Sequence, residues 1–133
     1  MKDVLLRALL LIDAAVLLAL GVVLIVAPHA AQAAFHFTDL PESATYITGS
    51  WGCALATMAL GYAVAARDPR RHVIWVQVGI ARGALECAVG AWYLSRGVVT
   101  FQQVGNGLIV ATVVTVAYLV LYPTSSRSRF RVA

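Results

Sequence analysis

Three charged residues, Asp13, Arg82 and Glu86, lie inside long apolar stretches of the sequence. A charge at the centre of a bilayer costs at least about 2.5–3.5 kcal/mol on insertion scales, so each needs a partner or water. Arg82 and Glu86 are four residues apart and therefore share one face of a helix. Such groups either move protons or ions through a membrane protein, or pair with one another and fix how its helices pack.

The depth of these residues predicts that they meet. Asp13 comes nine residues after Val4 and Arg82 ten residues after His72, where their stretches are expected to enter the membrane from the same side. A rise of 1.5 Å per residue puts both at a depth of about 13–15 Å, with Glu86 one turn further out. We expect a buried cluster with Arg82 between the two acids. Its formal charge is −1, so one carboxylate is expected to be protonated or to meet another polar group.

A structural ion pair is the favoured interpretation of this cluster. A proton or ion pathway needs titratable groups leading to both surfaces, and the apolar stretches contain no histidine and no further acid. The alternative that stays open is a small oligomeric transporter or channel whose path is lined by Asp13, Arg82 and Glu86.

No other pattern in the sequence indicates chemistry. It has no nucleophile–base pair, no glycine-rich phosphate loop and no set of metal ligands, so neither an enzyme nor a metal site is predicted. His29 and His36 are seven residues apart, about 10 Å along a helix, which is too far to chelate one ion. Either could singly ligate a haem or chlorin, but interfacial histidines without ligands are commoner, and no cofactor is predicted.

The composition indicates which elements position the cluster. The 133 residues are 61% hydrophobic and only 12% charged, whereas soluble domains carry about 25% charged residues. This excludes an ordinary soluble globular domain, a disordered segment and a fibrous repeat. Four apolar stretches of 19 to 23 residues are each long enough to cross a hydrocarbon core about 30 Å thick. The sequence predicts an all-α, polytopic membrane protein: one four-helix transmembrane bundle with spans at about 5–27, 44–66, 73–94 and 104–122.

The segment between the first two spans is expected to lie on the outer membrane surface. Residues 28–38 are mildly amphipathic and too short to cross, which is typical of a short interfacial helix. Asp39 and Glu42 have the spacing of a capping box, with a proline between them, and predict the start of the second span.

The first span also resembles a signal peptide, because Lys2 and Arg7 precede the apolar run and an Ala-Gln-Ala follows it at 31–33. Its apolar region is longer than the usual 7–15 residues and is interrupted by Asp13. We expect this helix to remain in the mature protein.

The basic residues predict the orientation of the bundle. The net charge of +4 would suggest nucleic acid in a soluble protein, but eight of the ten basic residues stand at segment ends that fall on one side. These are Lys2, Arg7, Arg67, Arg70, Arg71, Arg127, Arg129 and Arg131. The positive-inside rule then predicts a bacterial inner membrane protein with both termini cytoplasmic, a short basic tail at 124–133, and no nucleic-acid partner. Four aromatic residues are expected near the inner interface: Tyr62, Trp75, Tyr118 and Tyr122.

Small residues recur at every fourth position in two of the spans and predict how these helices pack. The ridge of the second span is Gly49, Cys53, Thr57, Gly61 and Ala65, and the ridge of the third span is Gly79, Gly83, Cys87 and Ala91. Small residues at this spacing let helix backbones approach closely in lipid. We expect the second and third spans to pack together along these ridges, the alternative being that one ridge faces another chain. Cys53 and Cys87 fall at similar depth, but a disulfide is not expected.

The layout resembles small four-helix bacterial membrane proteins of the DoxX-like and BphX-like kind. The matching features are a first helix that ends Leu20-Gly21 and then Ala27-Pro28, glycines that open the second helix, and the turn that begins Arg67-Asp68-Pro69. Some members of these families look like accessory subunits of quinone-linked oxidoreductases, which implies association with such a complex and no catalytic residue.

The leading functional hypothesis is a non-catalytic structural or accessory subunit of a larger integral-membrane assembly. An oxidoreductase or another energy-converting complex is the candidate assembly. The chain is small, has almost no extramembrane mass and carries packing ridges without a reactive constellation. The expected partners are the lipid bilayer and other membrane-protein subunits or further copies of the chain.

Overall fold

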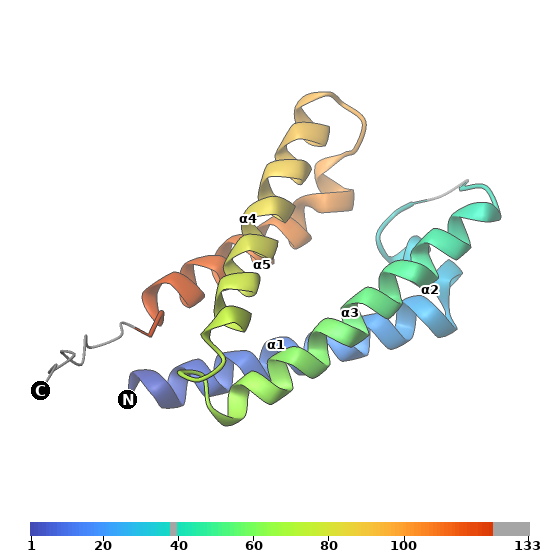
Figure 1. Ribbon diagram of the computed structural model, residues 1–133. Coiled ribbons are helices and arrows are strands. Elements are labelled where there is room, and N and C mark those ends of the chain that lie inside the picture. The colour runs from blue at the N-terminus through green and yellow to red at the C-terminus, as the bar shows by residue number, and fades with distance from the viewer. Residues whose placement is uncertain (38–39, 124–133) are drawn as a thin grey trace, which may run out of the picture.

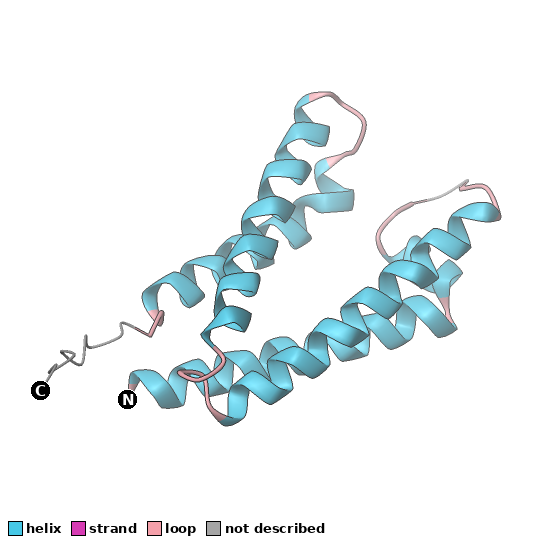
Figure 2. Ribbon diagram, in the orientation of Figure 1, coloured by secondary structure: helices cyan, strands magenta, loops and turns pink. Residues whose placement is uncertain are grey.

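The computed structural model describes residues 1–37 and 40–123, and within these all regular secondary structure is helical (Figure 2). The five helices are α1 (Lys2–Val26), α2 (Pro28–Ala34), α3 (Ser43–Arg67), α4 (Val73–Ser95) and α5 (Phe101–Val120). All except α2 are long and apolar enough to cross a membrane. The predicted fold class is therefore confirmed: a multi-pass, all-α membrane protein with a short helix between the first two spans. The predicted basic tail at 124–133 lies outside the described residues.

The ends of the helices follow local capping signals. Pro28 occupies the first turn of α2, where its missing N–H costs nothing. α5 begins at Phe101, earlier than the expected 104, and the Thr100 backbone N–H donates to Gln103 Oε1 over 2.8 Å at that end. α3 begins after Glu42, whose side chain makes no capping bond. The expected capping box pairs Glu42 with Asp39, which lies outside the described residues.

α1 and α3 form a long antiparallel pair that lies side by side over most of its length (Figure 1). The backbones approach most closely at two glycines. A Cβ added at Gly21 would lie 2.8 Å from the carbonyl oxygen of Gly52, and one added at Gly52 would lie 2.7 Å from that of Gly21. These distances leave no room for a side chain, so glycine at both positions permits the close packing of this pair.

α4 and α5 form the second pair, and here all the glycines at the contact belong to α4. Gly79 faces Tyr118, Gly83 faces Thr115, and a Cβ at Gly90 would lie 2.5 Å from Leu108. The small-residue ridge of α4 therefore receives side chains of α5.

The expected packing of α3 on α4 along their two ridges is not what the structure has. The ridge of α4 is occupied by α5, and α3 meets α1 through a different face, whose buried residues include Gly52, Leu55 and Ala59. Gly49, at the start of the α3 ridge, has no atom within 4 Å of an added Cβ. The physical reason is that Tyr118 and Thr115 of α5 already fill the space beside the α4 glycines, whereas Gly21 of α1 lets its backbone approach Gly52 closely.

The two helix pairs meet near the 68–72 turn, beyond which α4 diverges from α3 (Figure 1). At the far end, Gln103 Nε2 of α5 donates to the carbonyl oxygen of His36 over 3.1 Å. Aromatic side chains fill the junction: the Tyr62 ring lies 5.7 Å from Trp75, edge to face, and 6.3 Å from Tyr118, stacked. Tyr62 and Tyr118 are both 0% exposed. Both are expected near the inner interface of the membrane, and the structure adds that their side chains are core residues of the junction.

Candidate functional site

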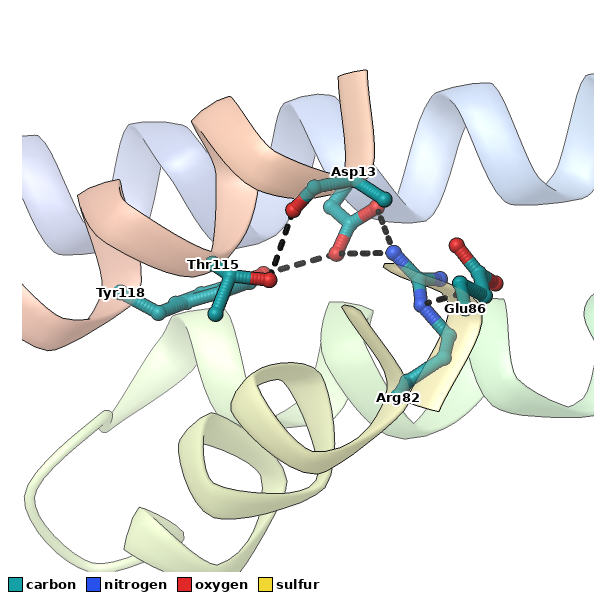
Figure 3. A network of polar contacts seen from close by, with 6 residues as sticks. Asp13, Arg82, Glu86, Thr115 and Tyr118 are labelled. Atoms are coloured by element: carbon teal, nitrogen blue, oxygen red, sulfur yellow. Dashed lines mark hydrogen bonds and ion pairs between the residues drawn. The ribbon is translucent and has the colours of Figure 1, made fainter. Parts of the chain in front are cut away.

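The site is a polar cluster at the junction of the two helix pairs (Figure 3). It begins with Asp13 on α1. Asp13 follows the same helix face as Leu6, Leu10, Leu17 and Leu24, all of which are buried. Because this face packs into the protein, the carboxylate is carried inside with only 6% of its surface exposed.

Arg82 of α4 is the cation that meets this carboxylate. Its Nη2 lies 3.1 Å from Asp13 Oδ1 and 3.3 Å from Oδ2. The Arg82 side chain is 15% exposed. The structure thus brings together the two residues that the depth estimate placed at one level, and the ion pair joins α1 of one pair to α4 of the other.

Tyr118 of α5 completes the coordination of Asp13. Its hydroxyl donates a 2.9 Å hydrogen bond to Asp13 Oδ2. Asp13 therefore contacts both helices of the second pair, through a charged donor on α4 and a neutral donor on α5. Charge-assisted hydrogen bonds of this kind are the strong ones.

Tyr118 was not among the residues predicted for the cluster from the sequence, although the direction of its side chain could have been inferred from its position in the helix. Side chains of a helix tilt toward the helix N-terminus. α5 begins at the end of the molecule remote from the chain's N-terminus, so the tilt directs Tyr118 toward the middle of the span, where Asp13 lies. Treating Tyr118 as an interfacial aromatic ignored this direction.

Glu86 belongs to the cluster only loosely. Its Oε1 lies 3.8 Å from Arg82 Nε, within ion-pair range but beyond a hydrogen bond. Its side chain is 46% exposed. Figure 3 shows Tyr118 and Glu86 at opposite ends of the cluster, with Asp13 and Arg82 between them.

Two side chains of the cluster have polar atoms without a hydrogen bond. Arg82 Nε and Nη1 and the Tyr62 hydroxyl are buried, and no described residue accepts from or donates to them. The guanidinium also stands over the Tyr62 ring, 5.7 Å from its centroid, which is within cation–π range. One nitrogen of Arg82, Nη2, therefore donates to Asp13, and the guanidinium lies against the Tyr62 ring.

The residues of the predicted ridges are divided between different neighbours. On α3, Gly61 faces the Trp75 ring, while Cys53 is exposed and its carbonyl accepts from Thr57 Oγ1 over 2.9 Å. On α4, Cys87 Sγ lies 3.3 Å from Thr112 Oγ1 of α5. The two cysteines are free thiols in different helix pairs.

The cluster can hold helices together and carries a residual charge. Asp13, Arg82 and Glu86 sum to −1. Among residues 1–37 and 40–123, no group of three or more His, Cys, Asp or Glu side chains could hold a metal ion. The arrangement is that of an interhelical ion pair with one additional, half-exposed acid.

The chain matches no protein-family model, no curated protein and no solved structure. Its resemblance to the DoxX-like and BphX-like proteins stays a prediction.

Proposed function

We propose that the chain is a non-catalytic accessory subunit of a larger integral-membrane assembly. The observation that carries this proposal is the coordination of Asp13. Its two carboxylate oxygens accept from Arg82 and Tyr118, so the most deeply buried charge among the described residues is engaged in joining helices. A side chain held in this way contributes to architecture and is poorly suited to release and rebind a transported ion.

The distribution of the chain between membrane and water supports the same proposal. The described segments between the helices are short: 35–37, 40–42, 68–72 and 96–100. Such connections offer little surface for a soluble substrate. The outward surface of the helices is extensive: of the 20 residues of α5, only Gly105, Ala111 and Tyr118 are buried within the chain. This surface is available to lipid or to other transmembrane helices.

The cellular location belongs to the proposal as well. We place the protein in a bacterial cytoplasmic membrane with both termini inside. The start of α1 and the 68–72 turn lie at the same end of the molecule, where Arg70 Nη2 bonds to Asp3 Oδ2 over 2.8 Å. This end also contains Lys2, Arg67 and Arg71. A concentration of basic residues at one end of a membrane protein favours an orientation in which that end faces the cytoplasm.

The resemblance to DoxX-like and BphX-like proteins supports an oxidoreductase or another energy-converting complex as the assembly. The proposal is tested by purifying the tagged chain from its native membranes in a gentle detergent and measuring the mass and composition of the particle. We expect a stoichiometric complex with at least one other membrane protein. A particle containing only this chain would contradict the accessory function.

A second candidate is a small oligomeric transporter or channel, favoured by one observation: Glu86 is half exposed beside Arg82. Flux into proteoliposomes that is abolished by Asp13→Asn and by Glu86→Gln would support it. Absence of flux in the wild-type chain, or flux that survives both substitutions, would remove this mechanism.

A further inference from the structure

The contacts within the described chain do not fully neutralise the charge of the Glu86 carboxylate. The cluster contains one cation and two acids. Arg82 directs its hydrogen bonds to Asp13, at 3.1 and 3.3 Å, and stands 3.8 Å from Glu86. Of the two acids, Glu86 is thus the one without a hydrogen bond to Arg82 and the more exposed. An ionised carboxylate that is half exposed inside a span is costly in lipid, and a cation from outside the described chain would offset that cost.

The position of Glu86 defines where this cation must lie. Glu86 is about 20 Å along α4 from Val73, well inside the span and far from the basic end of the molecule. Mobile aqueous cations and lipid headgroups stay at the interfaces, so neither reaches this depth readily.

The surroundings of Glu86 suit a helix. Val89 and Tyr93 follow it on the same face of α4, and both are exposed, as is the neighbouring Leu85. Together they form an apolar strip with one acid in it, which we call the Glu86 face (Leu85, Glu86, Val89 and Tyr93). α4 also diverges from α3 beyond the junction, so this part of α4 is not covered by the first helix pair (Figure 1).

A second copy of the chain fits this face poorly. Symmetric packing of two copies through the same face brings one Glu86 toward the other, and like charges in a low-dielectric medium repel strongly. Charge complementarity instead requires a partner of opposite sign.

We propose that the Glu86 face docks a transmembrane helix of a different protein, and that an arginine or lysine near the middle of that helix pairs with the Glu86 carboxylate. The inference rests on the proposed function, since it specifies how this subunit would join its assembly. The partner's cation would neutralise the cluster, and its apolar side chains would pack against Val89 and Tyr93.

The test uses a synthetic transmembrane helix as the partner. The full chain, labelled with a donor fluorophore, is reconstituted in phosphatidylcholine vesicles with an acceptor-labelled Leu/Ala peptide that carries one central arginine. Energy transfer should report association about tenfold tighter than that of matched peptides with central leucine or glutamine. Arginine is chosen because it stays charged in a membrane.

The variants of the chain make the test specific. Glu86→Gln keeps the size of the side chain and should reduce binding of the arginine peptide to the level of the leucine peptide. A second variant, Glu86→Gln with Val113→Glu, moves the carboxylate to an exposed position on α5. It should not regain the binding, because the carboxylate is then flanked by Ile109, Val110 and Val116 of α5 and no longer by Val89 and Tyr93 of the Glu86 face.

Three results would overturn the proposal: equal binding of the arginine and leucine peptides, binding that survives Glu86→Gln, or binding that follows the carboxylate to α5. Energy transfer between two labelled copies of the chain that depends on Glu86, without binding of the arginine peptide, would identify a second copy as the occupant and also overturn it.

Purification from native membranes separates this inference from the proposed function. A complex that persists unchanged with Glu86→Gln would contradict the docking face and leave the accessory function intact. Arginine-peptide binding lost in Glu86→Gln, with no native complex, would support the face and contradict the function.

Discussion

Arg82 Nη2 lies 3.1 Å from Asp13 Oδ1, and this contact joins the two helix pairs beside the aromatic junction of Tyr62. Asp13 stands on α1 and Arg82 on α4, so the ion pair crosses the boundary between the pairs. Both side chains are largely buried, and Tyr118 adds a hydrogen bond from α5. The relative position of the pairs therefore depends on a polar contact in the interior of the membrane.

Tyr118→Phe should weaken the junction modestly. The substitution removes only the hydroxyl that donates to Asp13 Oδ2 and keeps the ring stacked on Tyr62. Interhelical hydrogen bonds in membrane proteins contribute about 0.6–1.7 kcal/mol, and we expect a loss of that size in the free energy of unfolding. Steric-trapping measurements in bicelles would provide the value. A loss below the error of the method would mean that this hydrogen bond contributes no stability.

Gly21→Ala should disrupt the packing of α1 on α3. The added methyl group would lie 2.8 Å from the backbone oxygen of Gly52 and 2.9 Å from the backbone nitrogen of Ala56, and neither atom can move without its helix. Overpacking of this kind costs about 1–3 kcal/mol.

Gly49→Ala is the matched control, because an added Cβ there has nothing within 4 Å. It should leave thermal stability in detergent unchanged or slightly raise it, since alanine is the better helix former. Equal effects of the two substitutions would contradict the close approach at Gly21.

Glu86→Gln should change the stability of the isolated chain by less than about 1 kcal/mol, because its carboxylate makes no hydrogen bond to Arg82 and polar contacts inside a membrane contribute only about 0.6 kcal/mol on average. The Glu86 carboxylate stands 3.8 Å from Arg82 and is 46% exposed. The unfolding free energy in bicelles, compared with that of the wild type, checks this. A loss of several kcal/mol would show that Glu86 is an integral part of the internal cluster and not a free docking group.

Labelling from the two sides of the membrane tests the proposed orientation. In a background with Cys53→Ala and Cys87→Ala, a cysteine introduced by Val98→Cys should react with an impermeant maleimide added to intact cells. One introduced by Arg71→Cys should react only after permeabilisation. The reverse pattern would place the termini outside.

The helices could be predicted from the sequence because their signals are local. Length and hydropathy alone define the four spans, and a proline marks the start of α2. The depth of Asp13 and Arg82 follows from a constant rise per residue. Each of these inferences needs only the position of a residue in its own helix.

The packing partners could not be predicted in the same way. Apolar helices contain several stripes of small residues, and which stripe is used depends on the residue that faces it. The ridge that starts at Gly49 and the face that contains Gly52 are both plausible on α3; in the structure Gly52 packs against Gly21 of α1, while the glycines of α4 are filled by side chains of α5. The burial of Tyr118 and Tyr62 could not be predicted for the same reason, because it depends on how the two helix pairs meet.

A double-mutant cycle on Asp13 and Arg82 tests the central claim, that this ion pair holds the helix pairs together, most directly. Asp13→Asn and Arg82→Met each leave the other charge buried without its partner, and each should lower the free energy of unfolding in bicelles by about 3–5 kcal/mol. The double variant leaves no unpaired charge between these positions and should be less destabilised than either single variant. Losses that add to within about 0.5 kcal/mol would show that the two side chains act independently and would contradict the claim.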